Sequence, residues 1–249
     1  MSTSFKDHFS GHAGDYRAGR PTYPTELFAW LAANTPRTEI AVDLGCGNGQ
    51  ASHGLALHFS TVIALDPSAE QIRQAEPHAR ITFGVAPAEA TSLPAGQADL
   101  VLAAQAFHWF DHARFFPELT RIAQPGGLFA AVSYATCAVT PAIDRVVQVL
   151  YHDVLDAWWP PERRHVEERY RDLPFPLPEV AAPALELVMR WDLAQFAAYL
   201  GTWSALKAWE KHHGSDPRAL IARDLTAAWG DPLQLRPVRW PLTIRAGRV

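Results

Sequence analysis

An acidic residue and three glycines at alternate positions form the first stretch of this chain that could do chemistry: Asp43, Gly45, Gly47 and Gly49. The apolar run at residues 40–44 predicts a buried strand, and residues 50–59 predict a helix. A strand that turns through glycines into the start of a helix brings bare backbone N–H groups close to a ligand. The pattern therefore favours a ligand-binding turn, with an ordinary tight turn as the alternative.

The spacing of the glycines bears on which ligand would bind. The dinucleotide fingerprint G-x-G-x-x-G needs a third glycine that lets helix and strand pack closely, and Gln50 occupies that place here. A nicotinamide-dependent dehydrogenase is therefore the weaker hypothesis, and no hydride-transfer constellation in the sequence supports it.

A second carboxylate ends the next predicted strand. Residues 60–66 predict a strand that ends in Asp66, and a carboxylate roughly 20 residues beyond such glycines binds a ribose diol in folds of this kind. The alternative is that Asp66 only caps the following helix, but Ser68 can supply that cap itself. We therefore prefer the ribose role.

Strands and helices alternate around these residues. Strands are predicted at 40–44, 60–66, 80–85, 98–104 and 128–133, and helices at 25–33, 50–59, 68–75 and 113–123, with a break at Pro125-Gly126-Gly127. This rhythm predicts a doubly wound parallel sheet, whose ligands lie outside the carboxyl ends of the strands. The later elements are expected to be a long helix at 141–159, an irregular segment at 160–183, a strand at 185–191, helices at 193–200, 203–212 and 216–229, and an edge strand at 235–245.

Composition restricts the class of protein. Of 249 residues, 48% are hydrophobic and 19% charged, which is typical of a globular protein with a sizeable core. A net charge of −4 offers no footprint for nucleic acid or an anionic membrane, and no apolar run approaches the ~18 residues of a spanning helix. Two cysteines and a polar N-terminus favour the cytoplasm. His212 and His213 lack further ligands at metal spacing, so no metal site is expected.

Five stretches follow one another in the order of a known family pattern. They are the glycine turn, Asp66, residues 86–89 after the third strand, residues 105–110 after the fourth, and residues 125–128 before the fifth. In this order they resemble the class I S-adenosylmethionine-dependent methyltransferases across residues 40–133. The resemblance implies an α/β, Rossmann-like fold with a seven-stranded, mostly parallel sheet and helices on both faces.

A narrower resemblance extends over nearly the whole chain. Tyr16 with residues 20–24 (RPTYP), residues 104–111 (AQAFHWFD) and residues 202–205 (TWSA) are similar to the trans-aconitate methyltransferase-like branch, methyltransferase type 11. The branch acts on small molecules, although one fold hosts many acceptors. We accordingly expect one domain over residues 1–249, divided into an N-terminal lid and helix (1–36), a cofactor-binding core (37–134), a helical cap insertion (135–192), and C-terminal helices with a final strand (193–249).

The resemblance implies S-adenosyl-L-methionine as cofactor and S-adenosyl-L-homocysteine as product. Asp43 and the glycine backbone would hold the amino-acid end, Asp66 the ribose, and Gln105 the methionine portion, while Pro67, Ala88 and Glu89 would lie at the adenine. The full set of implied cofactor-binding residues is Asp43, Gly45, Cys46, Gly47, Gly49, Asp66, Pro67, Ala88, Glu89 and Gln105.

The implied acceptor site lies where the methyl group would point. Its candidate residues are Tyr16, Arg17, Arg20, Tyr23, His108, Trp109 and Trp203. An ionised carboxylate acceptor needs no base, and Arg17 or Arg20 could bind a second carboxylate of the acceptor. Both arginines lie in a segment rich in glycine and aromatic residues. This segment would fold over the pocket as a lid or else form a surface extension. A hydroxyl or amine acceptor favours a base, for which His108 is the catalytic candidate. A histidine that only packs or hydrogen-bonds in its loop is the alternative.

The sequence therefore predicts a methyltransferase that acts on a small molecule. O-methylation, with a carboxylate as one acceptor, is the expected reaction; N- or C-methylation of a metabolite and a non-catalytic S-adenosylmethionine-binding protein stay open. Alignment of reactants can contribute ~7–11 kcal/mol, against ~10²–10⁴ in rate from a general base, so positioning should outweigh any single side chain. The expected assembly is a monomer or homodimer without nucleic-acid or membrane partners.

Overall fold

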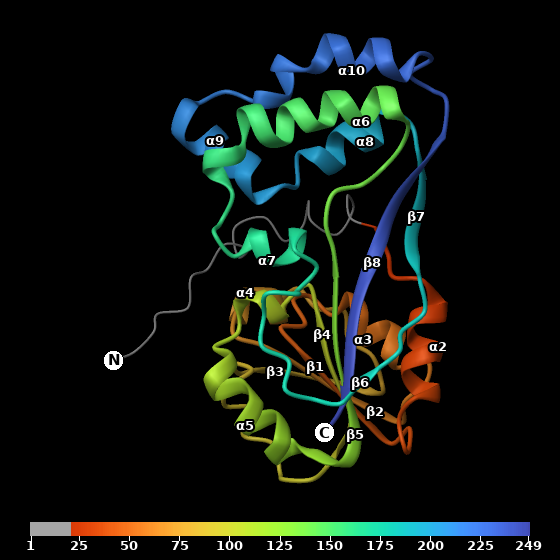
Figure 1. Cartoon of the computed structure of the whole chain (residues 1–249), viewed down its shortest axis with the longest axis vertical. Helices are drawn as coiled ribbons and strands as arrows, with labels where there is room; N and C mark the ends of the chain where they lie inside the picture. The colour runs from red at the N-terminus through yellow and green to blue at the C-terminus, as the bar shows by residue number, and fades with distance from the viewer. Residues whose placement is uncertain (1–20) are drawn as a thin grey trace.

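Within residues 21–249, which the computed structural model describes, eight strands form one sheet (Figure 1). The hydrogen-bonded order is β3-β2-β1-β4-β5-β8-β6, and β7 pairs with β8 beside this path. The strands are β1 (Ile40–Leu44), β2 (Thr61–Asp66), β3 (Ile81–Val85), β4 (Ala98–Ala104), β5 (Ala123–Tyr134), β6 (Glu179–Val180), β7 (Glu186–Trp191) and β8 (Arg236–Arg248). β1 to β5 run parallel to one another, which confirms the predicted, mostly parallel sheet.

The strand order reverses at the pair formed by β1 and β4 in the middle of the sheet. At such a reversal a crevice opens outside the carboxyl ends of the strands, because the connections leave toward opposite faces. The glycine turn follows β1, and residues 105–110 follow β4. Both predicted binding segments therefore meet at this point.

Helices cover both faces of the parallel strands (Figure 1). The helices of this part are α2 (Thr25–Ala33), α3 (Gln50–Leu55), α4 (Ala69–Arg73), the 3₁₀ turn η1 (Phe107–Trp109) and α5 (His112–Ile122). Leu100 and Leu102 of β4 pack in one hydrophobic cluster with α2 and α3, while Val101 and Ala103 pack in another with α5. Because side chains alternate along a strand, an uninterrupted apolar run such as β4 is buried on both faces.

Close packing of α3 on α2 depends on Gly54. A Cβ atom at this position would come within 2.1 Å of the Phe28 ring, which is far inside van der Waals contact. Gly54 therefore allows a close helix–helix contact, which differs from the helix–strand contact that the third glycine of the dinucleotide fingerprint allows.

β8 is an interior strand, so the predicted edge strand at 235–245 is wrong in its position. Residues 242–248 pair antiparallel with β5, and residues 236–241 pair antiparallel with β7. β6 pairs with β8 on the side away from β5. The described chain thus has eight strands and not seven, because the short β6 and β7 both add to β8.

A helical cap lies beyond the carboxyl ends of the parallel strands (Figure 1). It contains α6 (Pro141–Gln148), a π-helical turn η2 (Val149–Val154), a 3₁₀ turn η3 (Asp156–Trp158), α8 (Leu193–Leu200), α9 (Ser204–His213), a 3₁₀ turn η4 (Pro217–Leu220) and α10 (Ala222–Trp229), while α7 (Arg163–Glu167) lies between cap and sheet. α6, α8 and α10 bury their apolar side chains in one shared cluster, although they come from segments on either side of residue 192. The four-part division of a single domain stays a prediction.

Some element boundaries differ from those expected. The long helix predicted at 141–159 changes its winding at Val149, where the π-helical turn buries the consecutive residues Leu150 and Tyr151. The helix predicted at 50–59 ends at Leu55 because a turn leads into β2, and Pro125-Gly126-Gly127 lies within β5. No helix in the described part of the chain is both long and apolar enough to span a bilayer.

Candidate active site

The glycine turn folds back against the end of β2. The backbone N–H groups of Gly45 and Cys46 both donate to the carbonyl oxygen of Leu65, at 2.8 and 3.1 Å. The three glycines adopt φ values of +67°, +56° and +90° along the chain, a region that side chains with a Cβ rarely enter. At Gly45 the approach is also close, since a Cβ would lie 2.5 Å from that of Ala106 in the loop after β4.

Asp66 joins the turns that follow β1 and β2. Its Oδ2 atom accepts the backbone N–H of Gly47 at 2.8 Å, and its Oδ1 atom accepts that of Ser68, also at 2.8 Å. Ser68, and not Asp66, is the N-cap of α4, because its hydroxyl accepts the N–H of Gln71 at 3.3 Å. The capping alternative for Asp66 is therefore wrong, and its carboxylate lies beside the glycine turn.

Asp43 lies fully buried beneath the same turn. Its Oδ2 atom accepts the Ser52 hydroxyl at 2.6 Å, whereas its Oδ1 atom has no hydrogen-bond partner among the described residues. Burial, reinforced by the charge of Asp66, raises the pKa of Asp43 from 3.8 to about 7. A buried acceptor without a partner is costly in a folded protein, so this atom suits a cationic group or a water molecule that a ligand would bring.

This raised pKa predicts a pH dependence of stability that Asp43→Asn should remove. The folded state binds the proton of the Asp43 carboxyl group more tightly than the unfolded state does. The contribution of this proton to the free energy of unfolding is therefore lost as the pH rises from about 4 to about 7. Asparagine stays neutral, so its advantage over aspartate should grow by about 1–3 kcal/mol between pH 5 and pH 8. Urea unfolding of both proteins at the two pH values measures this difference; an advantage that does not change with pH would contradict it.

The residues assigned to the adenine lie around the ends of β2 and β3, where Pro67 is half-buried and Ala88 is buried. Cys46, in the glycine turn after β1, is buried as well, and burial raises the pKa of its thiol. Glu89 accepts the backbone N–H of Asp111 at 2.8 Å through its Oε1 atom. Glu89 therefore ties the loop after β3 to the start of α5.

The loop after β4 begins with an unusual backbone. Gln105 has φ +55° without being glycine, a conformation that costs about 1–2 kcal/mol and that concentrates at functional sites. Its backbone N–H donates to Val132 at 2.8 Å, and its side-chain amide donates to the carbonyl of Tyr134, also at 2.8 Å. These bonds hold Gln105 where β4 and β5 end.

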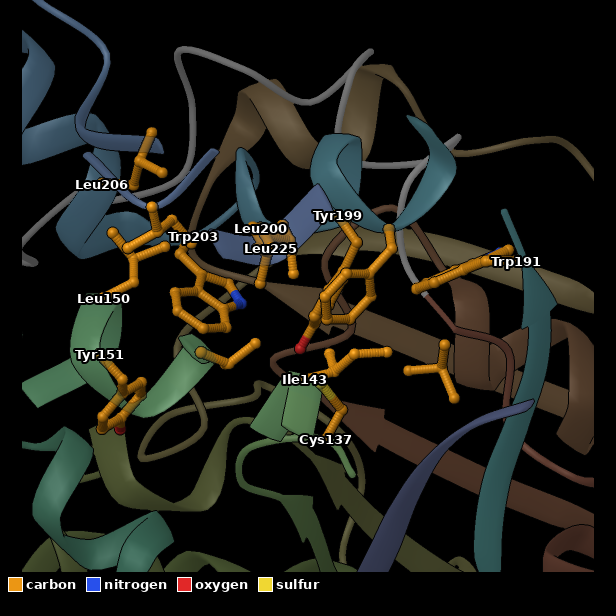
Figure 2. Packing of buried hydrophobic residues seen from close by; sticks show 14 of the residues in the cluster. Cys137, Ile143, Leu150, Tyr151, Trp191, Tyr199, Leu200, Trp203, Leu206 and Leu225 are labelled. Atoms are coloured by element: carbon orange, nitrogen blue, oxygen red, sulfur yellow. The ribbon is translucent and has the colours of Figure 1, made fainter. Parts of the chain in front are cut away.

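A pocket lies between this loop, the end of β5 and the cap. Its walls combine aromatic rings with a few polar groups, and its lining residues are Gln105, His108, Trp109, Tyr134, Ala135, Thr136, Trp159, Pro160, Arg163, Tyr199, Trp203 and Ser204. Figure 2 shows Trp203 between Tyr151 and Tyr199, whose ring centroids lie 5.6 and 6.0 Å from its own. Aromatic walls with few polar groups are typical of small-molecule sites.

His108 is held by the cap side of the structure. Its Nδ1 atom lies 2.9 Å from the Tyr170 hydroxyl, and Tyr170 is fixed because Arg245 donates to its carbonyl oxygen at 2.7 Å. Burial, with a further contribution from the charge of Arg163, lowers the pKa of His108 from 6.5 to about 3. The imidazole is therefore neutral at physiological pH and a weak proton acceptor.

NMR titration should show that the His108 ring stays neutral from about pH 9 down to about pH 4, because its pKa is lowered. An unperturbed histidine would instead titrate near 6.5. The ring signals can be assigned by their loss in His108→Gln. A midpoint between about 5.5 and 7 for these signals would show that the ring is solvated and would restore it as a candidate base.

A family model described as methyltransferase domain matches residues 42–131. A protein of Dictyostelium discoideum named as a methyltransferase is 30% identical over 231 residues, which cover 91% of this chain and 88% of that protein. The chain belongs to the S-adenosylmethionine-dependent methyltransferase family. A solved structure from Anaeromyxobacter dehalogenans, described as a type II methyltransferase, is 54% identical in sequence to this methyltransferase. The structural match covers 92% of this methyltransferase and 97% of the other chain, with a TM-score of 0.87.

The resemblance to the trans-aconitate branch is also confirmed. The trans-aconitate 2-methyltransferase of Methylobacterium radiotolerans is 37% identical over 109 residues, which cover 42% of this methyltransferase and 41% of that protein. The match leaves more than half of each chain outside it, so the acceptor of that enzyme is not thereby assigned to this one.

The structure brings four predicted residues of the methyltransferase together in one pocket: Gln105, His108, Trp109 and Trp203. Tyr23 lies apart from the lining and packs edge-on against Phe28 and Tyr134, with ring centroids 6.3 and 6.4 Å away. The other three candidates, Tyr16, Arg17 and Arg20, lie outside the described residues.

Sequence reasoning missed Trp159, Arg163 and Tyr199, which also line the pocket. Trp159 and Arg163 flank Pro160-Pro161 in a segment without periodicity, and Tyr199 lies in an ordinary amphipathic helix. The one available signal was the clustering of tryptophan, proline and arginine at residues 158–164, which resembles neither a strand nor a regular helix.

Proposed function

We propose that this methyltransferase methylates an oxygen atom of a small acceptor held in the pocket between η1 and the cap. One observation supports this most directly: the loop after β4 belongs to both sites. Gln105 lines the pocket, and its neighbour Ala106 lies so close to the glycine turn that Gly45 has no room for a Cβ. A donor on the turn and an acceptor in the pocket would face each other across this loop.

The residues at the carboxyl edge fit the family's cofactor. The Asp43 Oδ1 atom, which has no hydrogen-bond partner among the described residues, fits the positive charge of an amino-acid end, directly or through water, and the glycines would allow a close backbone contact. Asp66 would accept ribose hydroxyls, Gln105 would contact the methionine portion, and Pro67 with Ala88 would flank the adenine. When bound, S-adenosylmethionine would supply a methyl group bonded to a sulfonium sulfur; a lone pair of the acceptor takes the methyl carbon, and the sulfur leaves as S-adenosylhomocysteine.

The chain's own contribution to the reaction is alignment and exclusion of water. Trp109, Trp159 and Trp203 wall the pocket, while Tyr16, Arg17, Arg20 and Tyr23 stay proposed as acceptor-binding residues. A histidine whose pKa is lowered to about 3 is a poor general base, since effective bases have pKa values near the working pH. His108 is therefore proposed as a neutral hydrogen-bonding group, and the acceptor oxygen as one that is already ionised, such as a carboxylate.

A methyl-transfer screen tests this function. The purified chain is incubated with S-adenosylmethionine and panels of small acids, phenols, alcohols and amines, and formation of S-adenosylhomocysteine is measured. Turnover with acids or acidic phenols and none with amines is expected. Preferred turnover of amines would contradict O-methylation, and tight S-adenosylhomocysteine binding without turnover of any panel would favour a non-catalytic binding protein. A cytoplasmic monomer or homodimer stays part of the proposal.

A further inference from the structure

We infer that the acceptor carries a carboxylate on a flat apolar body, and that Arg163 binds this carboxylate. The inference rests on the proposed function because it concerns the same pocket. Among the described lining residues, Arg163 is the one with a permanent positive charge, and it comes from the start of α7 on the cap side. Arg163 was not among the acceptor-binding residues predicted from the sequence.

Arg163 is oriented by its Nε atom, which leaves its other nitrogens for a ligand. Nε donates to the Tyr151 hydroxyl at 2.8 Å, and that hydroxyl in turn donates to Glu167. Neither terminal nitrogen of Arg163 hydrogen-bonds another of the described residues, and the side chain keeps 22% of its surface exposed. Two parallel N–H groups on a planar guanidinium match the two oxygens of a carboxylate.

Two aromatic rings lie beside this guanidinium. Its central carbon lies 5.1 Å from the centroid of the Trp159 ring and 5.6 Å from that of Tyr151, distances at which a cation is attracted to a ring face. Trp159 is held in turn because its indole N–H donates to the Tyr151 carbonyl at 3.2 Å. The Trp159 and Trp203 rings, with centroids 5.5 Å apart, both line the pocket. They present flat apolar surface beside the charge, which suits a flat apolar body.

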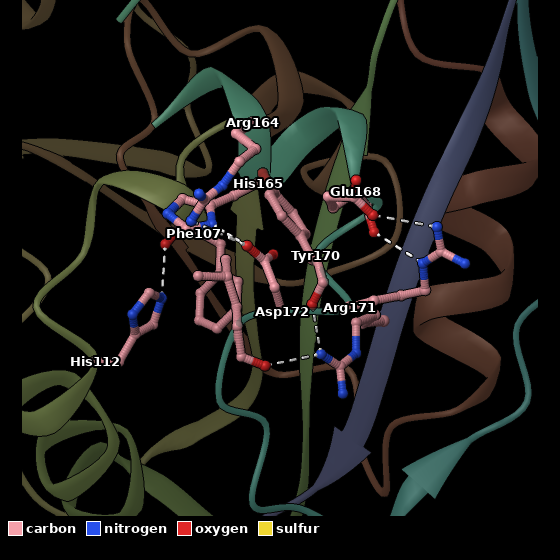
Figure 3. A network of polar contacts seen from close by, with 10 residues as sticks. Phe107, His112, Arg164, His165, Glu168, Tyr170, Arg171 and Asp172 are labelled. Carbon is pink, nitrogen blue, oxygen red and sulfur yellow. Dashed lines mark hydrogen bonds and ion pairs between the residues drawn. The ribbon is translucent and has the colours of Figure 1, made fainter. Parts of the chain in front are cut away.

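Polar contacts join α7, which begins at Arg163, to the segment that follows it (Figure 3). His165 lies 2.7 Å from Asp172 through its Nδ1 and Oδ2 atoms, and the same carboxylate lies 3.9 Å from Arg164. Tyr170, which follows α7, contacts His108 of η1. The start of α7 is therefore tied to the loop that carries the candidate acceptor residues, and the site needs no large rearrangement to form.

The local charge favours a singly charged group at Arg163 itself, and the oxygen that is methylated lies elsewhere on the acceptor. Glu167 lies 3.8 Å from the Arg163 Nε atom and offsets part of the arginine's charge, so a doubly charged phosphate would be less well balanced than a carboxylate. The positive field of Arg163 reaches His108, whose pKa it helps to lower. An anion bound at Arg163 would therefore direct the rest of the acceptor toward His108 and Gln105.

Binding of small probes to the full chain saturated with S-adenosylhomocysteine tests the inference. Ligand-observed NMR titrations compare trans-cinnamate with cinnamamide, which has the same flat body without the charge, and with phenyl phosphate. The wild-type protein should bind trans-cinnamate at least tenfold more tightly than the amide. Arg163→Gln should remove this preference, and Arg163→Lys should retain part of it, because lysine keeps the charge and loses the paired geometry.

Arg164→Gln is the matched control, since it removes the same charge from the next residue. The Arg164 side chain is 73% exposed and does not line the pocket, so the preference for the acid should be unchanged. Calorimetry with S-adenosylhomocysteine shows that each variant is folded. The conservative Arg163→Lys protein keeps the test decisive if Arg163→Gln fails to fold.

Three results would overturn the inference: equal affinity for acid and amide, a preference for the acid that survives in Arg163→Gln, or tighter binding of phenyl phosphate than of trans-cinnamate. Each leaves the proposed function standing if the chain turns over an acid or an acidic phenol in the methyl-transfer screen. Failure of the wild-type chain to bind S-adenosylhomocysteine would instead overturn the proposed function, and the inference with it.

Discussion

Alanine in place of Gly45 is expected to destabilise the fold by about 2–5 kcal/mol and to remove most of the affinity for S-adenosylhomocysteine. The left-handed backbone at φ +67° alone costs a residue with a Cβ about 1–2 kcal/mol. The new Cβ would also lie 2.5 Å from that of Ala106, and relieving such a contact in a packed region costs about 1–3 kcal/mol. Urea unfolding measures the stability, and calorimetry measures the affinity.

Gly47→Ala separates the two causes. Gly47 has a similar φ of +56°, but the nearest atom to an added Cβ, Oε1 of Gln71, is 3.8 Å away. Only the backbone cost of about 1–2 kcal/mol should remain, and binding should weaken less than in Gly45→Ala. Equal losses in both variants would show that Ala106 yields to the new methyl group, and that the contact between the two loops is not what positions the turn.

Asp66→Ala should weaken S-adenosylhomocysteine binding by about 10- to 100-fold, since hydrogen bonds to a charged group contribute about 1.5–3 kcal/mol. Asp66 accepts the N–H groups of Gly47 and Ser68 in the protein, and the proposed ribose contact would add to these bonds. Removing the carboxylate therefore loosens the turn and deletes the ligand contact together. Calorimetric titration of the variant at constant pH measures the loss, and wild-type affinity would refute the ribose role.

Glu70→Ala provides the control for net charge, because Glu70 is a carboxylate in α4 close to Asp66 in the chain and forms a surface ion pair with Arg73. It should leave the affinity unchanged. Asp66→Asn keeps the shape of the side chain but can accept only one of the two backbone N–H groups. Its affinity should fall between those of the wild type and Asp66→Ala.

Much of the parallel core could be predicted because its signals are local. The apolar runs at 40–44 and 98–104 are β1 and β4 with the predicted bounds, and the periodic stretch at 193–200 is α8. Ser68 was recognisable as a helix cap from its type and position alone. Such features depend on neighbours a few residues away, which periodicity and capping preferences report.

The acceptor pocket followed no such local rule. The contact between His108 and Tyr170 joins residues 62 apart in sequence, and Arg163 lies in a proline-rich stretch with no period to interpret. β8 alternates as an edge strand would, yet strand partners on both sides place it inside the sheet. The raised pKa of Asp43 and the lowered pKa of His108 arise from burial, which residue types do not reveal.

The sequence by itself determined the family, the parallel sheet and the glycine turn, because each follows from residue types, their spacing and the order of short segments along the chain. The tertiary structure decided which side chains share the pocket, that His108 is a neutral group, and that Arg163 supplies the cation. These properties depend on how distant segments pack and exclude water, and such packing is set by the whole fold.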